Sequence, residues 1–269
     1  MLKNYSVGPG SGAGIKIIKS GIRIAILFFI IMPFSLPCAK AQETESFFTS
    51  GNLEYEKGNY PGAIADYEKA RLTGKISSAL YYNLAGAYLK SGDIGRAVLN
   101  YERAINLSPR DADIAANYGF AKSLVTGKEP QPRGFFSWRP IRIYNRFLTV
   151  NEMTIITSVL FFLFFIFLGL SVVLGSSKVK ASLAAIVLGA LVIFSSFLVF
   201  QKVKEQNSYA VIVVPSTDAF FGPFDSATKF FTLHEGNSVM ILETKDSWHR
   251  VRRQDGMVGW VKNMDLERL

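Results

Sequence analysis

Tyr88-Leu-Lys-Ser-Gly92-Asp-Ile94-Gly-Arg-Ala97-Val-Leu-Asn-Tyr101-Glu-Arg-Ala104 repeats a pattern that the chain already carries at 54–70, displaced by 34 residues. The earlier copy reads Glu54-Tyr-Glu-Lys-Gly58-Asn-Tyr60-Pro-Gly-Ala63-Ile-Ala-Asp-Tyr67-Glu-Lys-Ala70. Small residues at these places let two antiparallel helices approach closely, and the tyrosines fill the space between neighbouring helices. A period of this length predicts a solenoid of helical pairs.

The period and its landmarks resemble the tetratricopeptide repeat. The second copy follows the pattern more closely, because it ends at Pro109 where the first has Lys75. An alanine-rich stretch follows, and Asp111 is expected to be the N-cap of a capping helix there. The resemblance implies an α-helical domain at 42–127, with repeats at 44–77 and 78–111 and the capping helix at 112–126.

Repeats of this family bind extended or helical peptides on the concave face that the first helix of each pair forms. In this chain that face carries Phe48, Asn52, Tyr55, Tyr82, Asn83, Lys90 and Asn117. We expect the three asparagines to hydrogen-bond a peptide backbone. The family's carboxylate-clamp subclass has lysine where this chain has Phe48, so capture of a C-terminal carboxylate is not expected. The alternative stays open that these side chains only coat a short solenoid, since two repeats offer a small footprint.

Two apolar blocks occupy the middle of the chain and are separated only by residues 175–180. Each has about 20 residues, which at about 1.5 Å per residue cross a hydrocarbon core of about 30 Å. We expect transmembrane helices at 153–174 and 181–200, joined as a hairpin that leaves both flanking parts on one side. Neither block contains Asp, Glu, Arg, Lys or His, so the hairpin is expected to be a tether and not an ion pathway.

The net charge of +9 lies mainly outside the two parts expected to be soluble. The segments 1–41, 42–129, 130–206 and 207–269 carry +5, −1, +6 and −1 respectively. This distribution excludes a basic nucleic-acid-binding domain and favours contact with lipid headgroups. Residues 128–152 are expected to be a linker and membrane-interface segment, in which aromatic and cationic side chains alternate.

Residues 1–41 have the organisation of a secretory signal peptide. A basic start precedes the apolar run 24–34, and the small residues of Ala39-Lys-Ala41 predict cleavage before Gln42. Cleavage removes Cys38, the only cysteine of the chain, so cysteine chemistry is not expected. The alternative, an uncleaved anchor, exports the following residues in the same way.

Two signals disagree about the side of the membrane. A functional leader places both soluble parts on the periplasmic side of a bacterial inner membrane. The positive-inside rule alone favours the opposite orientation, because four arginines precede the first span: Arg133, Arg139, Arg142 and Arg146. We expect the leader to dominate, since the hairpin loop has two lysines of its own, Lys178 and Lys180.

Residues 207–269 read as short strands with tight turns. Strands are expected at 209–214, 229–236, 238–244, 248–253 and 257–261, with Asp255-Gly256 as a hairpin turn. The spacing of the glycines and tryptophans resembles the bacterial SH3-like domain and implies a small all-β barrel. We expect Trp260 to pack in its core and Trp248 to lie partly on its surface, as an anchor for a wall peptide or a protein. The alternative stays open that both tryptophans are structural.

Nothing in the chain predicts an enzyme. The two histidines, His234 and His249, lie in the strand region and form no metal motif. No nucleophile elbow, phosphate-binding loop or pair of catalytic carboxylates is present. We therefore expect no catalytic residue, no cofactor and no metal.

A leader, two tetratricopeptide repeats, a membrane hairpin and a terminal SH3-like domain, in this order, resemble the BatE-type component of the Bat aerotolerance family. The resemblance implies a role in oxidative-stress resistance and assembly with Bat membrane proteins that bear von Willebrand factor A domains. The residues themselves favour a non-catalytic membrane-anchored scaffold. The alternative is an envelope sensor or peptidoglycan-binding protein that acts through the SH3-like domain.

Overall fold

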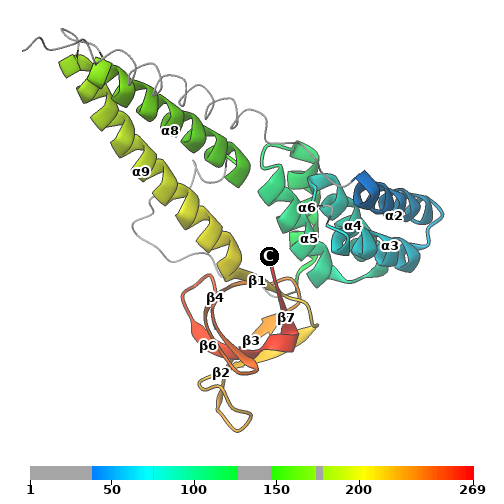
Figure 1. The fold of residues 1–269 in the computed structure, drawn as a ribbon. Coiled ribbons are helices and arrows are strands. Elements are labelled where there is room, and N and C mark those ends of the chain that lie inside the picture. Colours follow the sequence, from blue (N-terminus) through cyan, green and yellow to red (C-terminus); the bar gives the residue numbers. More distant parts are fainter. Residues whose placement is uncertain (1–37, 75, 127–146, 174–177) are drawn as a thin grey trace, which may run out of the picture. The chain divides into compact units, whose positions relative to one another are not determined.

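The computed structural model describes residues 38–74, 76–126, 147–173 and 178–269 (Figure 1). Residues Gln42–Leu269 form one compact unit, which is described below. The signal peptide predicted at 1–41 lies outside the described residues except for its last four, and so does most of the segment 128–152.

Five helices form the N-terminal part of this unit. They are α2 (Cys38–Glu56), α3 (Tyr60–Leu72), α4 (Ser78–Ser91), α5 (Ile94–Leu107) and α6 (Ala112–Leu124). Short polar side chains cap four of them: the oxygens of Asn59, Ser77, Asp93 and Asp111 accept hydrogen bonds from backbone N–H groups in the first turns. Gly92 ends α4 at a φ of +88°, where a side chain would be strained.

The landmark residues of the repeat form the core between these helices. Ala63, Tyr67 and Ala70 are buried against Leu84. A Cβ atom at Gly51 would lie 2.6 Å from the ring of Tyr67, so the glycine lets α2 lie directly against that tyrosine. The small and aromatic landmarks therefore have the packing role that the sequence predicts for them.

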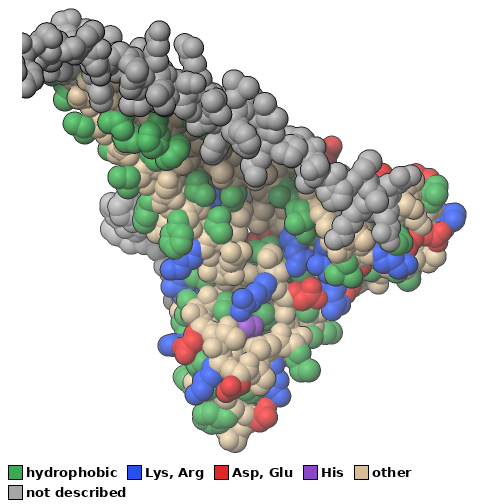
Figure 2. Space-filling view, viewed as in Figure 1, with side chains coloured by type: hydrophobic (Ala, Val, Ile, Leu, Met, Phe, Trp, Pro, Cys, Tyr) green, Lys and Arg blue, Asp and Glu red, His purple; other side chains and the backbone are tan. Residues whose placement is uncertain are grey.

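Two long helices, α8 (Val150–Val173) and α9 (Lys178–Ser208), pack along each other. Their stretches Val150–Ser171 and Val179–Ser208 are long and apolar enough to span a membrane, and only 6% and 11% of their most apolar windows are buried inside the protein. Figure 2 shows hydrophobic side chains on the surface of this pair. Helix α9 runs beyond the predicted end of the second span at residue 200 and continues to Ser208, directly before the first strand.

One small residue and two hydroxyl groups are among the contacts between these two helices. A Cβ atom at Gly189 would lie 3.2 Å from the ring of Phe164, so this glycine accommodates the phenylalanine. Thr157 and Ser195 share a hydrogen bond across the pair. The hairpin is thus a packed pair of helices and not two independent segments.

The C-terminal part is one antiparallel sheet of seven strands in the order β3-β2-β6-β5-β4-β1-β7. Its strands are β1 (Tyr209–Ile212), β2 (Ser216–Phe220), β3 (Lys229–His234), β4 (Ser238–Lys245), β5 (Trp248–Arg252), β6 (Val258–Lys262) and β7 (Leu266–Arg268). The sequence did not predict β2 or β7. The predicted barrel is not confirmed, because no pairing among the described strands joins β3 to β7 and the sheet is not closed.

Neither tryptophan of the sheet has the placement expected. Trp248 is only 6% exposed, and its ring meets Phe220 edge to face at 5.7 Å between centroids. Trp260 is half-buried, because its neighbours Gly259 and Val261 point inward and side chains alternate along a strand. The prediction of Trp248 as a surface anchor is therefore wrong.

The sheet packs against the last repeat through an apolar cluster. Val98 and Leu99 of α5 are buried together with Val211 and Val213, which lie in and directly after β1. A Cβ atom at Gly95 would lie 2.7 Å from the carbonyl oxygen of Ile212, so α5 and the chain around β1 touch backbone to backbone. The helix predicted at 112–126 to cap the last repeat thus covers only part of it, since the sheet covers α5.

Hydrogen bonds surround this apolar contact. The Gly95 N–H donates to Glu235 Oε1 at 2.7 Å, and Arg96 Nε donates to Glu267 Oε1 at 3.0 Å. Lys122 Nζ of α6 donates to the carbonyl oxygen of Gly236 at 3.2 Å. The repeats and the sheet are joined by directional contacts as well as by burial.

Candidate peptide-binding groove

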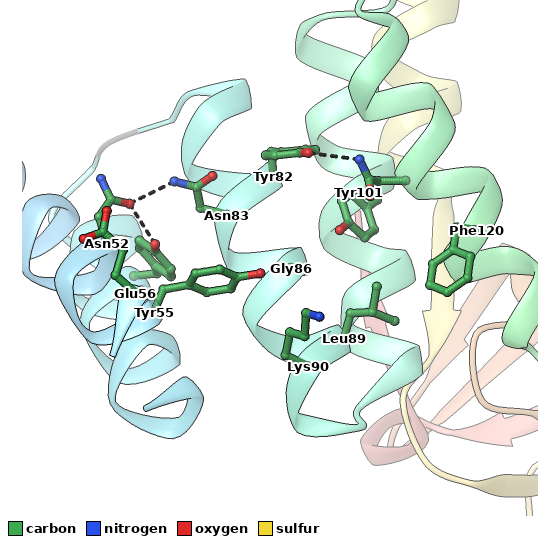
Figure 3. Close-up of a pocket in the computed structure, with 12 residues that line it drawn as sticks. Asn52, Tyr55, Glu56, Tyr82, Asn83, Gly86, Leu89, Lys90, Tyr101 and Phe120 are labelled. Carbon is green, nitrogen blue, oxygen red and sulfur yellow. Dashed lines mark hydrogen bonds between the residues drawn. The ribbon is translucent and has the colours of Figure 1, made fainter. Parts of the chain in front are cut away.

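A cavity of about 540 Å³ opens on the face of the repeats formed by α2, α4 and α6 (Figure 3). Six of the seven side chains that the sequence predicts for peptide binding line it: Asn52, Tyr55, Tyr82, Asn83, Lys90 and Asn117. The structure therefore brings these six together on one surface. Their role in binding stays a prediction.

The seventh predicted residue, Phe48, does not line the cavity. It is half-buried, and its ring centroid lies 5.9 Å from that of Tyr67 in the core between α2 and α3. Its apolar side chain is part of the packing of the first repeat. Phe48 is therefore a core residue of the first repeat and not a groove residue.

Asn52 and Asn83 are held by a shared hydrogen bond at one side of the groove. Asn52 Oδ1 accepts from Tyr67 Oη at 2.8 Å and from Asn83 Nδ2 at 2.9 Å, as the dashed lines in Figure 3 show. Asn52 Nδ2 and Asn83 Oδ1 have no hydrogen-bond partner among the described residues. One fixed donor and one fixed acceptor thus remain for a ligand, and these are the two groups that a peptide bond pairs with.

Asn117 has a different arrangement. Its Nδ2 donates to Tyr82 Oη at 2.9 Å and to the carbonyl oxygen of Asp113 at 2.9 Å. Its side-chain N–H donors are directed to the protein, so Asn117 orients Tyr82. The ring of Tyr82 in turn meets that of Tyr101 edge to face at 5.8 Å.

Two buried phenols form the base of the groove. Burial raises the pKa of Tyr67 to about 12, and it raises the pKa of Tyr101 to about 12 as well. Both hydroxyls therefore keep their protons at physiological pH. The base of the groove is uncharged and polar, while Glu56 and Lys90 supply one charge of each sign in its lining.

The sequence prediction missed half of the lining, namely Glu56, Tyr67, Gly86, Leu89, Tyr101 and Phe120. The sequence pattern could have predicted several of these residues, because the 34-residue period continues into α6. Asn52, Gly86 and Phe120 occupy equivalent positions, and so do Asn83 and Asn117. Treating 112–126 as the first helix of a third repeat would have identified Phe120, which is 55% exposed.

Metal-binding chemistry is not indicated by the part of the chain that the structure describes. Within those ranges no three His, Cys, Asp or Glu side chains come together in a group that could hold a metal ion. His249 hydrogen-bonds Thr244 through Nδ1 at 2.8 Å inside the sheet, and His234 lies on β3.

Comparison with known proteins supports the repeat and little beyond it. The tetratricopeptide repeat model matches residues 78–111, the second predicted repeat. Serine/threonine-protein phosphatase T of Trypanosoma brucei brucei is 30% identical over 84 residues, which is 31% of this chain and 18% of that protein. The C-terminal TPR-containing domain of a Plasmodium falciparum FK506-binding protein is 23% identical, with a TM-score of 0.31, over 40% of this chain and 79% of that domain.

This chain therefore spans less than a fifth of the curated relative that it matches. The matched repeat points to a role in protein–protein interaction. The two apolar helices could in addition span a membrane.

Proposed function

We propose that the protein is a non-catalytic, membrane-anchored scaffold whose repeats bind an extended segment of a partner protein in the groove. The observation that carries the proposal is the pairing of Asn52 with Asn83, which fixes one free donor and one free acceptor beside an apolar surface. An extended peptide presents N–H and C=O groups with the same alternation. Phe120 and Leu89 offer apolar contact for a side chain of such a peptide.

We expect Asn83→Ala to weaken the binding of a partner peptide about tenfold, since a hydrogen bond to a peptide group is lost and Asn52 loses its support. A photocrosslinking amino acid placed at Phe120 in the full chain would capture the partner, and the captured sequence supplies the peptide for calorimetry. The same crosslinker at Leu72, exposed and outside the groove, is the control position.

Asn106→Ala is the matched control variant, because Asn106 lies on α5 outside the groove. Equal affinities of wild type and Asn83→Ala would contradict the proposal. So would equal crosslinking yields at Phe120 and Leu72.

We infer that α8 and α9 anchor the protein in a bacterial inner membrane, with the repeats and the sheet on the periplasmic side. The leader-like composition of 1–41 and the exposed apolar surface of the two helices support this placement. The order of the modules supports the further proposal of a Bat-type complex with proteins that bear von Willebrand factor A domains, and of a role in oxidative-stress resistance.

The orientation predicts the activity of reporter fusions. Alkaline phosphatase fused after Leu269 or inserted at Asp113 is expected to be active, because the enzyme folds only outside the cytoplasm. A fusion in the hairpin loop at 175–180 is the control and is expected to be inactive. Inactive enzyme at both of the first two sites would reverse the orientation.

Two other readings are not proposed. The name of the matched phosphatase is not transferred, because the match covers 18% of that protein. Recognition of peptidoglycan by the sheet depended on Trp248 as an exposed anchor, and Trp248 is buried.

A further inference from the structure

A second cavity, of about 240 Å³, lies where the repeats meet the ends of the two apolar helices. Thr149, Val150 and Asn151 line it from the start of α8, and Gln206 and Asn207 line it from the end of α9. The remaining lining comes from α5, from the start of α4 and from the C-terminal strand region. Among the described residues, the lining includes one cationic side chain, Arg103.

Within the described ranges, Arg103 makes hydrogen bonds only to uncharged groups. Its Nη1 donates to Asn100 Oδ1 at 3.2 Å, its Nη2 donates to the carbonyl oxygen of Arg268 at 2.6 Å, and its guanidinium carbon lies 5.8 Å from the ring centroid of Tyr81. No carboxylate of the described residues is within ion-pair distance of it. Its burial lowers the pKa of the guanidinium, which reflects the cost of desolvating this cation.

The two carboxylates that act on the charge of Arg103 are each paired with another arginine. Glu68 pairs with Arg71 at 2.6 Å, and Glu267 pairs with Arg96 at 3.0 Å. Arg103 is thus a half-buried cation beside a cavity. Among the described residues, Glu68 and Glu267 favour its charge from beyond ion-pair distance and are themselves paired with other arginines. Desolvating this cation is costly, and an anion in the cavity would lower that cost.

The rest of the lining indicates which anion fits. The amide side chains of Asn106, Asn151, Gln206 and Asn207 are neutral hydrogen-bonding groups, as is the hydroxyl of Thr149. Ile76, Leu107 and Val150 add an apolar wall next to the apolar stretch of α8. An arginine fork surrounded by neutral donors suits a phosphate group, and the apolar wall suits a ligand whose other end is hydrocarbon.

We propose that this cavity binds the phosphate of a membrane phospholipid headgroup, with Arg103 as its counter-ion. The proposal rests on the anchoring of α8 and α9 in a membrane, and it goes beyond the binding of a partner protein by the groove. A lipid held there would bridge the repeats and both apolar helices at the surface of the bilayer.

The test uses the full chain in a neutral detergent and two probes, a short-chain phosphatidylglycerol and inorganic phosphate. We expect native mass spectrometry to show a phosphatidylglycerol adduct on the wild type, and we expect Arg103→Gln to weaken it about tenfold. Arg250→Gln is the matched control, because Arg250 lies on β5 away from this cavity.

Inorganic phosphate distinguishes the source of the ligand. Phosphate that displaces the lipid, and that binds as tightly in an Arg103-dependent way, would overturn the lipid assignment in favour of a soluble phosphate. Equal lipid binding by wild type and Arg103→Gln would overturn the site itself.

Two measurements keep the test decisive. If Arg103→Gln does not fold, Asn151→Leu removes a neutral donor from the other side of the cavity and is expected to weaken the adduct as well. A wild-type chain that stays soluble without detergent would refute the membrane anchoring. A chain that needs detergent but binds no lipid would refute only the present proposal.

Discussion

Gly95→Val is expected to destabilise the protein by about 3 kcal/mol, through overpacking and the loss of a charge-assisted hydrogen bond. A Cβ atom at this position would lie 2.7 Å from the carbonyl oxygen of Ile212 and 2.9 Å from the Cα atom of Val213. Both are backbone atoms and cannot rotate away. Separation of the two backbones would also break the bond from the Gly95 N–H to Glu235 Oε1.

Differential scanning calorimetry of the full chain in detergent measures this effect. We expect the wild type to unfold the repeats and the sheet together, and the variant to unfold them in two separate transitions. Gly119→Val is the matched control, because Gly119 lies in α6 and a Cβ atom there would have no neighbour within 4 Å. If the two variants melt alike, the sheet is not coupled to α5 in solution.

Leu84→Ala is expected to lower the free energy of unfolding by about 2–5 kcal/mol, as for other large-to-small changes in a packed core. Leu84 is fully buried in α4 among Ala63, Tyr67 and Ala70, which are the landmarks of the first repeat. These residues belong to two neighbouring helical pairs. The cavity left by the leucine would therefore loosen the contact between the two repeats.

Leu72→Ala is the control for this change, because Leu72 has the same side chain and is 75% exposed at the end of α3. Its effect is expected to be below about 0.5 kcal/mol. Denaturant unfolding measures the stability loss of each variant. It is followed by circular dichroism at 222 nm, where the amides of a helix absorb. A similar loss in both variants would mean that the repeats do not pack as described.

The repeat could be predicted from sequence because its signal is internal. Ala63 and Tyr67 match Ala97 and Tyr101 at a constant spacing, and the structure places each of these in the core. Six groove residues followed from the same frame, since side chains on one helix face are set by the period alone. The same frame placed Phe48 in the groove, but its ring packs against Tyr67 in the core between α2 and α3, a contact that the repeat period does not contain.

The contact between α5 and the sheet is indicated in the sequence only when the two repeats are compared. Pro61 and Ala65 are exposed in the first repeat, whereas the equivalent Gly95 and Leu99 are buried in the second. A leucine and a glycine on the outer face of a helix indicate a neighbour there. The identity of that neighbour depends on contacts more than 100 residues apart, which no local pattern contains.

The tryptophans were misplaced for a local reason. The run Val258-Gly-Trp-Val261 alternates, and the inward positions belong to Gly259 and Val261. Trp248 begins β5 and lies beneath Phe220 of β2, a strand that the sequence did not predict. Because that strand was not predicted, the burial of Trp248 by Phe220 could not be predicted either.

Helix α9 has no break between its apolar stretch and the sheet, so it fixes the distance between them. The eight residues from Gln201 to Ser208 hold the first strand at a set height, about 12 Å beyond the apolar residues at about 1.5 Å per residue. One inserted residue would raise the sheet by about 1.5 Å and turn it by about 100° around the helix axis. In the membrane-anchored state proposed above, a partner of the sheet would meet it at that distance from the bilayer and from that direction, which favours neighbours that are fixed in the same bilayer.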